Sequence, residues 1–199
     1  MTDNNSNLYD TVQCRYFKKP GPQNTKAVLE IVSKRAEELA VKKILLATNS
    51  GRTAFETFEI FGPAFKIFAL SHVTGFQKPN HQELAEDVRR ELESKGITVL
   101  TCQHAFGGIG RAIRNKLATY QVDEIMANVL RTFGQGTKVA VELALMAADA
   151  GLVRTDEDII SVGGTGKGAD TALLLQPANS FHFFDLKVKE VICKPAVFP

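Results

Sequence analysis

The sequence has few of the features that mark membrane proteins, disulfide-rich proteins and nucleic-acid-binding proteins. No apolar stretch approaches the roughly 20 residues that a membrane-spanning helix needs. Only three cysteines occur, at positions 14, 102 and 193 without CxxC spacing, so we expect free thiols in a reducing cytoplasm. The formal net charge is +2, and the basic residues are spread among the acids. This distribution argues against nucleic acid as a main partner.

The usual catalytic patterns are missing as well. Four histidines and three cysteines lack the spacing of metal ligands, so we expect no metal site. No Ser/His/Asp or Cys/His set and no pair of carboxylates suited to acid–base chemistry can be recognised. The glycine-rich segment 163–170 is not a phosphate-binding loop of the Walker A type, because Ser161 and Gly168 stand where that motif needs Gly and Ser or Thr. The sequence therefore indicates a binding site more clearly than a reaction.

The length and composition are those of one soluble globular domain. The chain has 199 residues, of which 44% are hydrophobic and 23% charged, which is enough to bury a sizeable core. The first ten residues, MTDNNSNLYD, are polar and slightly acidic, unlike a signal or transit peptide. We expect residues 1–11 to form a flexible lead and residues 12–199 a single domain.

Apolar runs alternate with helical patterns along the chain. We expect buried strands at 42–48, 65–71 and 97–103 and helices from about 25, from about 52 and across 84–92, which is the order of a parallel sheet covered by helices. The first helix should bury one face, made of Val28, Leu29, Val32, Ala36 and Leu39. Further elements are expected as helices within 105–120, 123–133 and 138–151 and as strands at 12–17, 157–164, 171–177 and 188–195.

The turn after the first of these buried strands has the composition of a phosphate-binding loop. It contains Asn49, Ser50, Gly51, Arg52 and Thr53 at the start of a helix. Glycine allows close approach of the backbone, and the N–H groups of the helix start, the hydroxyls and the guanidinium suit an anion. The structural alternative is that Ser50 or Asn49 caps the helix and that Arg52 is a solvated surface residue.

Two other loops should open at the same edge of the sheet, because carboxyl ends of parallel strands lie together. His72, Thr74 and Gly75 follow the second strand, and His104 follows the third. Each histidine is either an acid–base group or a structural hydrogen-bonding residue. Segment 163–170 is either a flexible hairpin or a second wall of the site. The spacing of Arg111 and Arg114 on a short helix favours two solvated charges over a phosphate clamp. The spacing of Lys138 and Glu142 favours an ion pair at a helix edge.

Two segments resemble the C-terminal domain of pyruvate kinase. ILLATNSGRTAFETFEIFGPAFKIFALSH, residues 44–72, resembles the strand, Ser-Gly-Arg-Ser/Thr loop, helix and strand of that domain, whose loop holds a phosphate of the allosteric sugar bisphosphate. EDIISVGGTGKGADTALLLQP, residues 157–177, resembles the loop that closes over this effector. The match covers most of the chain from Thr25 onward, and the catalytic barrel of pyruvate kinase has no counterpart in it.

The chain is more similar still to small stand-alone proteins of this superfamily from archaea and bacteria. Shared motifs are Lys19-Pro20-Gly21 with Asn24-Thr25, residues 136–151 and residues 163–172. This resemblance implies an α/β fold with three layers (α/β/α) and a mixed, mostly parallel five-stranded sheet whose last core strand is antiparallel. It also implies a homo-oligomer and flavin mononucleotide (FMN) as an associated ligand.

The resemblance also implies where a ligand sits. Ser50, Gly51, Arg52 and Thr53 would hold its phosphate, and residues 164–171 would form the opposite loop. That loop lacks the aromatic and arginine residues that grip a second phosphate in the enzyme, which suits a ligand with one phosphate and a larger remainder. The ligand-binding residues predicted in this way are Asn24, Thr25, Asn49, Ser50, Gly51, Arg52, Thr53, His72, Thr74, Gly75, His104, Gly163, Gly164, Thr165, Gly166, Lys167, Gly168, Asp170 and Thr171.

Three functions remain open at this stage. The first is a cytoplasmic protein that binds a small phosphorylated molecule, FMN above all. The second is a flavin-dependent oxidoreductase or another enzyme acting on a phosphorylated metabolite through His104, His72 or Lys138. The third is a regulatory or structural oligomer with a vestigial site.

Overall fold

One mixed sheet forms the centre of the molecule. The computed structural model describes residues 8–197, so part of the lead expected at residues 1–11 lies outside the described residues. The strands lie in the order β1-β7-β6-β5-β2-β3-β4. Their bounds are β1 Arg15–Phe17, β2 Lys43–Ala47, β3 Lys66–Ser71, β4 Thr98–Thr101, β5 Ile159–Gly163, β6 Thr171–Gln176 and β7 Lys187–Pro195.

The sheet has seven strands, so the expectation of five is wrong. Strands β5, β2, β3 and β4 are parallel, and β6 is antiparallel to β5 as expected for the last core strand. Strand β6 is not an edge, however, because β7 pairs antiparallel with it and β1 pairs parallel with β7. These two additions satisfy backbone groups that an exposed β6 would leave unpaired. They also bury Ile192 and Cys193.

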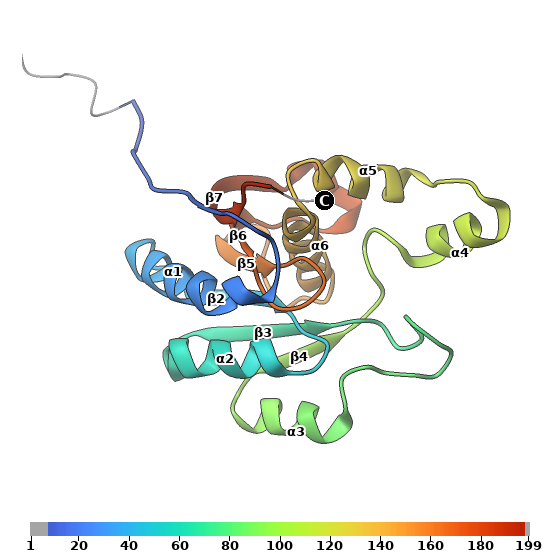
Figure 1. The fold of residues 1–199 in the computed structure, drawn as a ribbon, viewed down its shortest axis with the longest axis horizontal. Helices are drawn as coiled ribbons and strands as arrows, with labels where there is room; N and C mark the ends of the chain where they lie inside the picture. Colours follow the sequence, from blue (N-terminus) through green and yellow to red (C-terminus); the bar gives the residue numbers. More distant parts are fainter. Residues whose placement is uncertain (1–7, 198–199) are drawn as a thin grey trace, which may run out of the picture.

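Helices cover both faces of the sheet, giving three layers (Figure 1). Helices α1 (Thr25–Glu38), α2 (Arg52–Phe61) and α3 (Glu86–Ser94) contribute to the core on one face. Helices α5 (Val122–Arg131) and α6 (Gln135–Asp149) contribute to the core on the other. Short 3-10 helices lie at Pro22–Asn24, Gly62–Ala64 and Ser180–Asp185. None of the helices in the described part of the chain is long and apolar enough to cross a membrane.

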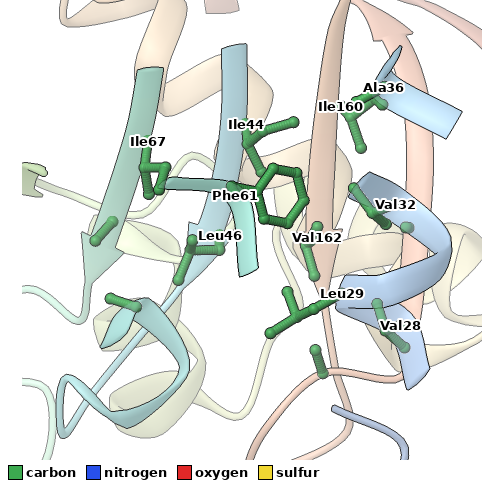
Figure 2. Packing of buried hydrophobic residues seen from close by; sticks show 14 of the residues in the cluster. Val28, Leu29, Val32, Ala36, Ile44, Leu46, Phe61, Ile67, Ile160 and Val162 are labelled. Carbon is green, nitrogen blue, oxygen red and sulfur yellow. The ribbon is translucent and has the colours of Figure 1, made fainter. Parts of the chain in front are cut away.

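The hydrophobic periodicity of α1 correctly predicted its buried face except at Leu39, which follows the helix and is half-buried. Val28, Leu29, Val32 and Ala36 are fully buried, and Figure 2 shows α1 facing the strand that carries Ile160 and Val162. Helix α6, apolar almost all round in sequence, lies between the sheet and α5 and is buried on nearly every side. Burial of these side chains on both faces is the main source of stability for such a fold.

Helix α4 (Gly108–Leu117) differs from the other α-helices because none of its residues is buried. In Figure 1 it lies at the right-hand edge of the molecule, outside the three layers, and is followed in sequence by α5. Its contacts with the body come from a few polar groups, described below.

Candidate functional site

The carboxyl ends of four parallel strands bring the predicted site loops to one edge of the sheet. Strands β5, β2, β3 and β4 lie side by side in this order. They are followed by the loops at 164–170, 48–51, 72–85 and 102–107, respectively. The glycine-rich loop and the Ser-Gly-Arg-Thr turn therefore follow neighbouring strands, as the parallel order of the sheet requires.

The turn before α2 has a left-handed glycine and no side-chain cap. Gly51 is the N-cap residue with φ 83° and no side-chain cap hydrogen bond, and its N–H donates to Thr48 Oγ1 at 3.0 Å. Asn49 and Ser50 therefore do not cap the helix, contrary to the structural alternative. A Cβ at Gly51 would lie 2.4 Å from Val88 Cγ1, so both the conformation and the space at this position require glycine.

The Arg52 side chain points to solvent in this structure. It is 78% exposed, and its Nε donates to Glu56 Oε1 at 2.7 Å. Ser50 is exposed and Thr53 is buried. An exposed ion pair of this spacing contributes only about 0.3–0.5 kcal/mol, so the guanidinium can leave Glu56 and bind another anion at little cost in free energy.

The glycine-rich loop is a hairpin between β5 and β6 that is tied down at its base. Asp170 is fully buried, and its Oδ2 accepts hydrogen bonds from Gly21 N at 2.9 Å and Thr165 N at 3.2 Å. Its Oδ1 accepts from Thr171 Oγ1 at 2.9 Å. Asp170 and Thr171 therefore hold the loop against the turn before α1. At the tip, Gly166 and Lys167 are exposed.

The start of α1 packs against this loop through Thr25, which was predicted as a ligand-binding residue and makes structural hydrogen bonds here. Thr25 Oγ1 donates to Pro22 O at 2.8 Å and accepts from Ala169 N at 3.0 Å. Asn24 is the N-cap residue of α1 but makes no side-chain cap; its Nδ2 donates to Lys19 O instead. One polar atom of the loop has no partner among the described residues, the buried Thr165 Oγ1.

The two histidines of the neighbouring loops lie together around an aromatic ring. The His72 ring stacks on Phe76 at 4.0 Å, and the His104 ring lies 5.2 Å from Phe76 and 5.4 Å from His72 between centroids. His72 Nδ1 is 2.6 Å from Glu83 Oε2. On α4, the Arg111 guanidinium lies 5.3 Å from the centroid of Phe76. Thr74 and Gly75 are exposed in the same loop.

A buried charge cluster connects this group to α6. Lys138 Nζ hydrogen-bonds Glu142 Oε2, and both side chains are only 5% exposed. Glu142 Oε1 accepts from Phe106 N at 3.0 Å, and Oε2 lies 3.7 Å from His104 Nδ1. The expectation of an ion pair at a helix edge is therefore wrong in its placement. The sequence did contain a signal of this burial, because Lys138 and Glu142 are opposite charges four residues apart in a helix that is otherwise apolar.

The environment shifts the pKa values of this pair. Burial alone would raise the pKa of the Glu142 carboxyl, but His104 and Lys138 outweigh it and lower the pKa to about 2. Burial lowers the pKa of the Lys138 amine, opposed by Glu142 and assisted by the charges of Arg131 and Arg111. Because Glu142 also accepts a backbone N–H, we take the pair as ionised at neutral pH.

Two arginines give this region an excess of positive charge. No described acidic side chain forms an ion pair with Arg111 or Arg131, whereas Arg114 Nη1 pairs with Glu124 Oε1 at 2.9 Å. The Arg111 Nε is buried without a hydrogen-bond partner among residues 8–197. Arg111 is half-buried, so the expectation of plain solvated charge does not hold for it.

Helix α6 joins the glycine-rich loop to the charge cluster. A Cβ at Gly136 would lie 2.2 Å from Thr171 Oγ1 and 2.8 Å from Asp170 Oδ1, so the helix begins in direct contact with the base of the loop. Lys138 and Glu142 follow on the same helix. Glycine at position 136 is required by this close approach.

Hollows are also present away from the carboxyl edge. One lies between α1 and the chain around β1, lined by residues such as Arg15, Ile31 and Arg35. Another lies at the amino ends of β2 and β5, lined by residues including Lys43 and Glu157. The carboxyl edge is marked instead by its glycine loops and its cluster of histidine, lysine and arginine side chains.

Comparisons with known proteins place residues 26–175 in a family described as pyruvate kinase, alpha/beta domain. Among solved structures, the chain is similar to the pyruvate kinase of Cryptosporidium parvum, with 16% identity and a TM-score of 0.37. That match covers 78% of this chain and 23% of the enzyme, so the chain spans about a quarter of its length. The family assignment rests on the first of these matches alone.

Proposed function

Because this chain belongs to the pyruvate kinase alpha/beta domain family, we propose that it binds a small phosphorylated ligand at the carboxyl edge of the sheet. The phosphate lies on Ser50, Gly51, Arg52 and Thr53, and the glycine-rich loop forms the opposite wall. The observation that carries this proposal is the uncapped start of α2. Its first-turn N–H groups have no side-chain cap, and the same turn carries the exposed Ser50 hydroxyl and the exposed Arg52 guanidinium.

FMN is the ligand that we propose to test first. It combines one phosphate with a large polar ring system, and the tip of the glycine-rich loop offers one cation, Lys167, among small residues. The unpartnered Thr165 hydroxyl in the same loop has bonding capacity for a polar ligand atom. An ultraviolet–visible spectrum of freshly purified protein, with identification of any released small molecule, tests the ligand class directly.

Removal of the Arg52 guanidinium tests the phosphate position. A lost charged hydrogen bond costs about 1.5–3 kcal/mol, so Arg52→Ala should weaken binding of FMN about 10- to 150-fold by titration calorimetry. Arg90→Ala is the matched control, because Arg90 is 74% exposed on α3 and pairs with Glu86 in the same i,i+4 manner. Equal affinity of the two variants would remove Arg52 from the site.

The buried charge cluster favours a second candidate function, catalysis. Lys138, Glu142 and His104 lie in contact, with His72 beside His104, and shifted pKa values such as those of Lys138 and Glu142 are characteristic of functional sites. We propose turnover of NADH by flavin-loaded protein as the assay and His104→Ala as the inactive variant. A protein that carries no ligand and is stabilised by no phosphorylated compound would leave the third alternative, a regulatory or structural oligomer with a vestigial site.

A further inference from the structure

Helices α4 and α5 expose an unusually large number of apolar side chains. We define the arm face as the seven large residues of this region that are at least 50% exposed: Ile109, Leu117, Tyr120, Val122, Ile125, Val129 and Phe133. Val122, Ile125 and Val129 follow a helical spacing of three and four residues, so they form one stripe on α5, and Phe133 follows two residues after the helix ends. Ala127, Met126 and Leu130 of the same helix pack into the core instead.

The helix α4 has too few contacts to be stable on its own. It has ten residues, includes Gly108 and Gly110, and buries none of them. An isolated helix shorter than about 12–15 residues is marginal in water. Contacts that hold it include the Arg114–Glu124 ion pair, the close approach of Gly110 to Asp123, and Arg111 over Phe76. A further surface against α4 would supply the burial that it lacks.

From these observations we infer that the arm face is the contact surface between two copies of this chain. Each exposed side chain offers on the order of 100 Å², so the seven together offer roughly 700 Å². This is close to the ~800 Å² per partner that a standard stable interface buries. Monomeric proteins seldom leave an apolar area of this size in water. The inference concerns assembly and needs no bound ligand.

The charges around the arm face favour a second copy over an unrelated partner. Helix α4 carries Arg111, Arg114 and Lys116 and no acid, whereas α5 begins with Asp123 and Glu124. Arg114 and the buried Glu124 pair within one chain, which leaves Lys116 and Asp123 to meet a partner. A two-fold arrangement, the commonest symmetry of homo-oligomers, that sets α4 of one copy against α5 of the other brings opposite charges together. Among the described residues, Lys116 and Asp123 have no ion-pair partner within their own chain.

The same contact would act on the ligand-binding edge. Arg111 extends from α4 to Phe76, which lies between the two histidines. Fixing α4 between two copies therefore fixes Arg111 over the loop that follows β3.

Sedimentation equilibrium of the full chain tests this interface. The wild type should self-associate, and Ile125→Asp/Val129→Asp should raise the dissociation constant at least tenfold, since both side chains lie in the stripe. Leu8→Asp is the matched control, because Leu8 is also a large exposed apolar residue but lies before β1; its association should equal that of the wild type. Far-UV circular dichroism checks that the variants are folded.

Hydrogen exchange of the wild type at low and high protein concentration gives a second readout that needs no variant. Amides of α4 and α5 should exchange more slowly at high concentration, while those of the amino ends of β2 and β5 stay unchanged. Two results would overturn the inference. One is a wild-type monomer at about 100 μM, a concentration at which an interface of this size holds partners together. The other is self-association that neither slows exchange in the two helices nor weakens in the folded double variant.

Discussion

Replacing Glu142 with glutamine tests the buried charge cluster at its centre. The substitution keeps the size of the side chain but removes the negative charge that faces Lys138 and His104. Because the Lys138 side chain is 5% exposed, its ammonium group would be left in a buried position without a counter-ion. Loss of one partner of a buried pair destabilises a protein by about 3–5 kcal/mol.

An exposed pair of the same spacing provides the control. Lys26 precedes Glu30 by four residues on α1, and the two side chains are 82% and 58% exposed. Glu30→Gln should change the free energy of unfolding by no more than about 0.5 kcal/mol, because water screens the charges. The expected difference between the two Glu→Gln variants is thus several kcal/mol and arises from the burial of Glu142 and from its contacts with Lys138 and His104.

The pH dependence gives the prediction a sign. The pKa of Glu142 is lowered from 4.5 to about 2, so its stabilisation is present above pH 4.5 and is lost as the pH falls toward 2. The full effect is on the order of 3 kcal/mol. The wild type should therefore lose more stability than Glu142→Gln in this acid range. Toward alkaline pH the variant should gain stability, because burial, Arg131 and Arg111 all favour a neutral Lys138.

Urea unfolding followed by far-UV circular dichroism measures these differences, since the chain has no tryptophan to serve as a fluorescence probe. Lys138→Met/Glu142→Gln should recover part of the stability lost in Glu142→Gln, because it leaves no buried charge unpaired. The reasoning would be refuted by a Glu142→Gln variant as stable as Glu30→Gln at neutral pH, or by a deficit that is independent of pH.

Two further predictions concern the loops of the site. Gly51→Ala should destabilise more than Gly75→Ala in urea unfolding. Both glycines have positive φ, but an added Cβ meets Val88 Cγ1 at 2.4 Å only at Gly51. An additional Val88→Ala substitution should therefore reduce the loss of stability caused by Gly51→Ala. Equal losses of stability in the two single variants would contradict the clash. Asp170→Asn should cost about 1–3 kcal/mol of stability. The amide oxygen can accept from Gly21 N and Thr165 N, but the NH₂ group that replaces the second carboxylate oxygen cannot accept from Thr171 Oγ1. Asp158→Asn, which affects an exposed pair with Lys189, should leave the thermal unfolding midpoint nearly unchanged, and similar midpoints for the two variants would argue against this role of Asp170.

The regular elements were predictable because their signals are local. The helical spacing of Val28, Leu29 and Val32 predicted the buried face of α1, and the apolar runs predicted β2, β3 and β5 within a residue or two. Alternation of strands and helices then placed the loops after β2, β3 and β4 at one edge, since a helix between two strands returns the chain to the same end of the sheet and so makes the strands parallel. The loop composition at residues 49–53 pointed to the start of α2 without the structure.

Other features depend on residues that are far apart in the chain. The pairing of β6 with β7 and of β7 with β1 enlarged the sheet beyond the five expected strands. Asp170 binds the backbone of Gly21 across 149 residues. The i,i+4 spacing of Lys138 and Glu142 is the same on an exposed helix face as on a buried one. The packing of His104 and Phe106 against Glu142 is what makes this a buried pair and not an exposed one.

The sequence by itself determined the α/β class, the order of the main elements and the edge at which the site loops meet. These follow from hydrophobic periodicity and turn chemistry, which act over a few residues. Only the tertiary structure decided which charges are buried, which loop residues are engaged in structural hydrogen bonds and which apolar side chains stay exposed on α4 and α5. The reason is that burial and pairing depend on which distant segments meet, and no local pattern encodes that meeting.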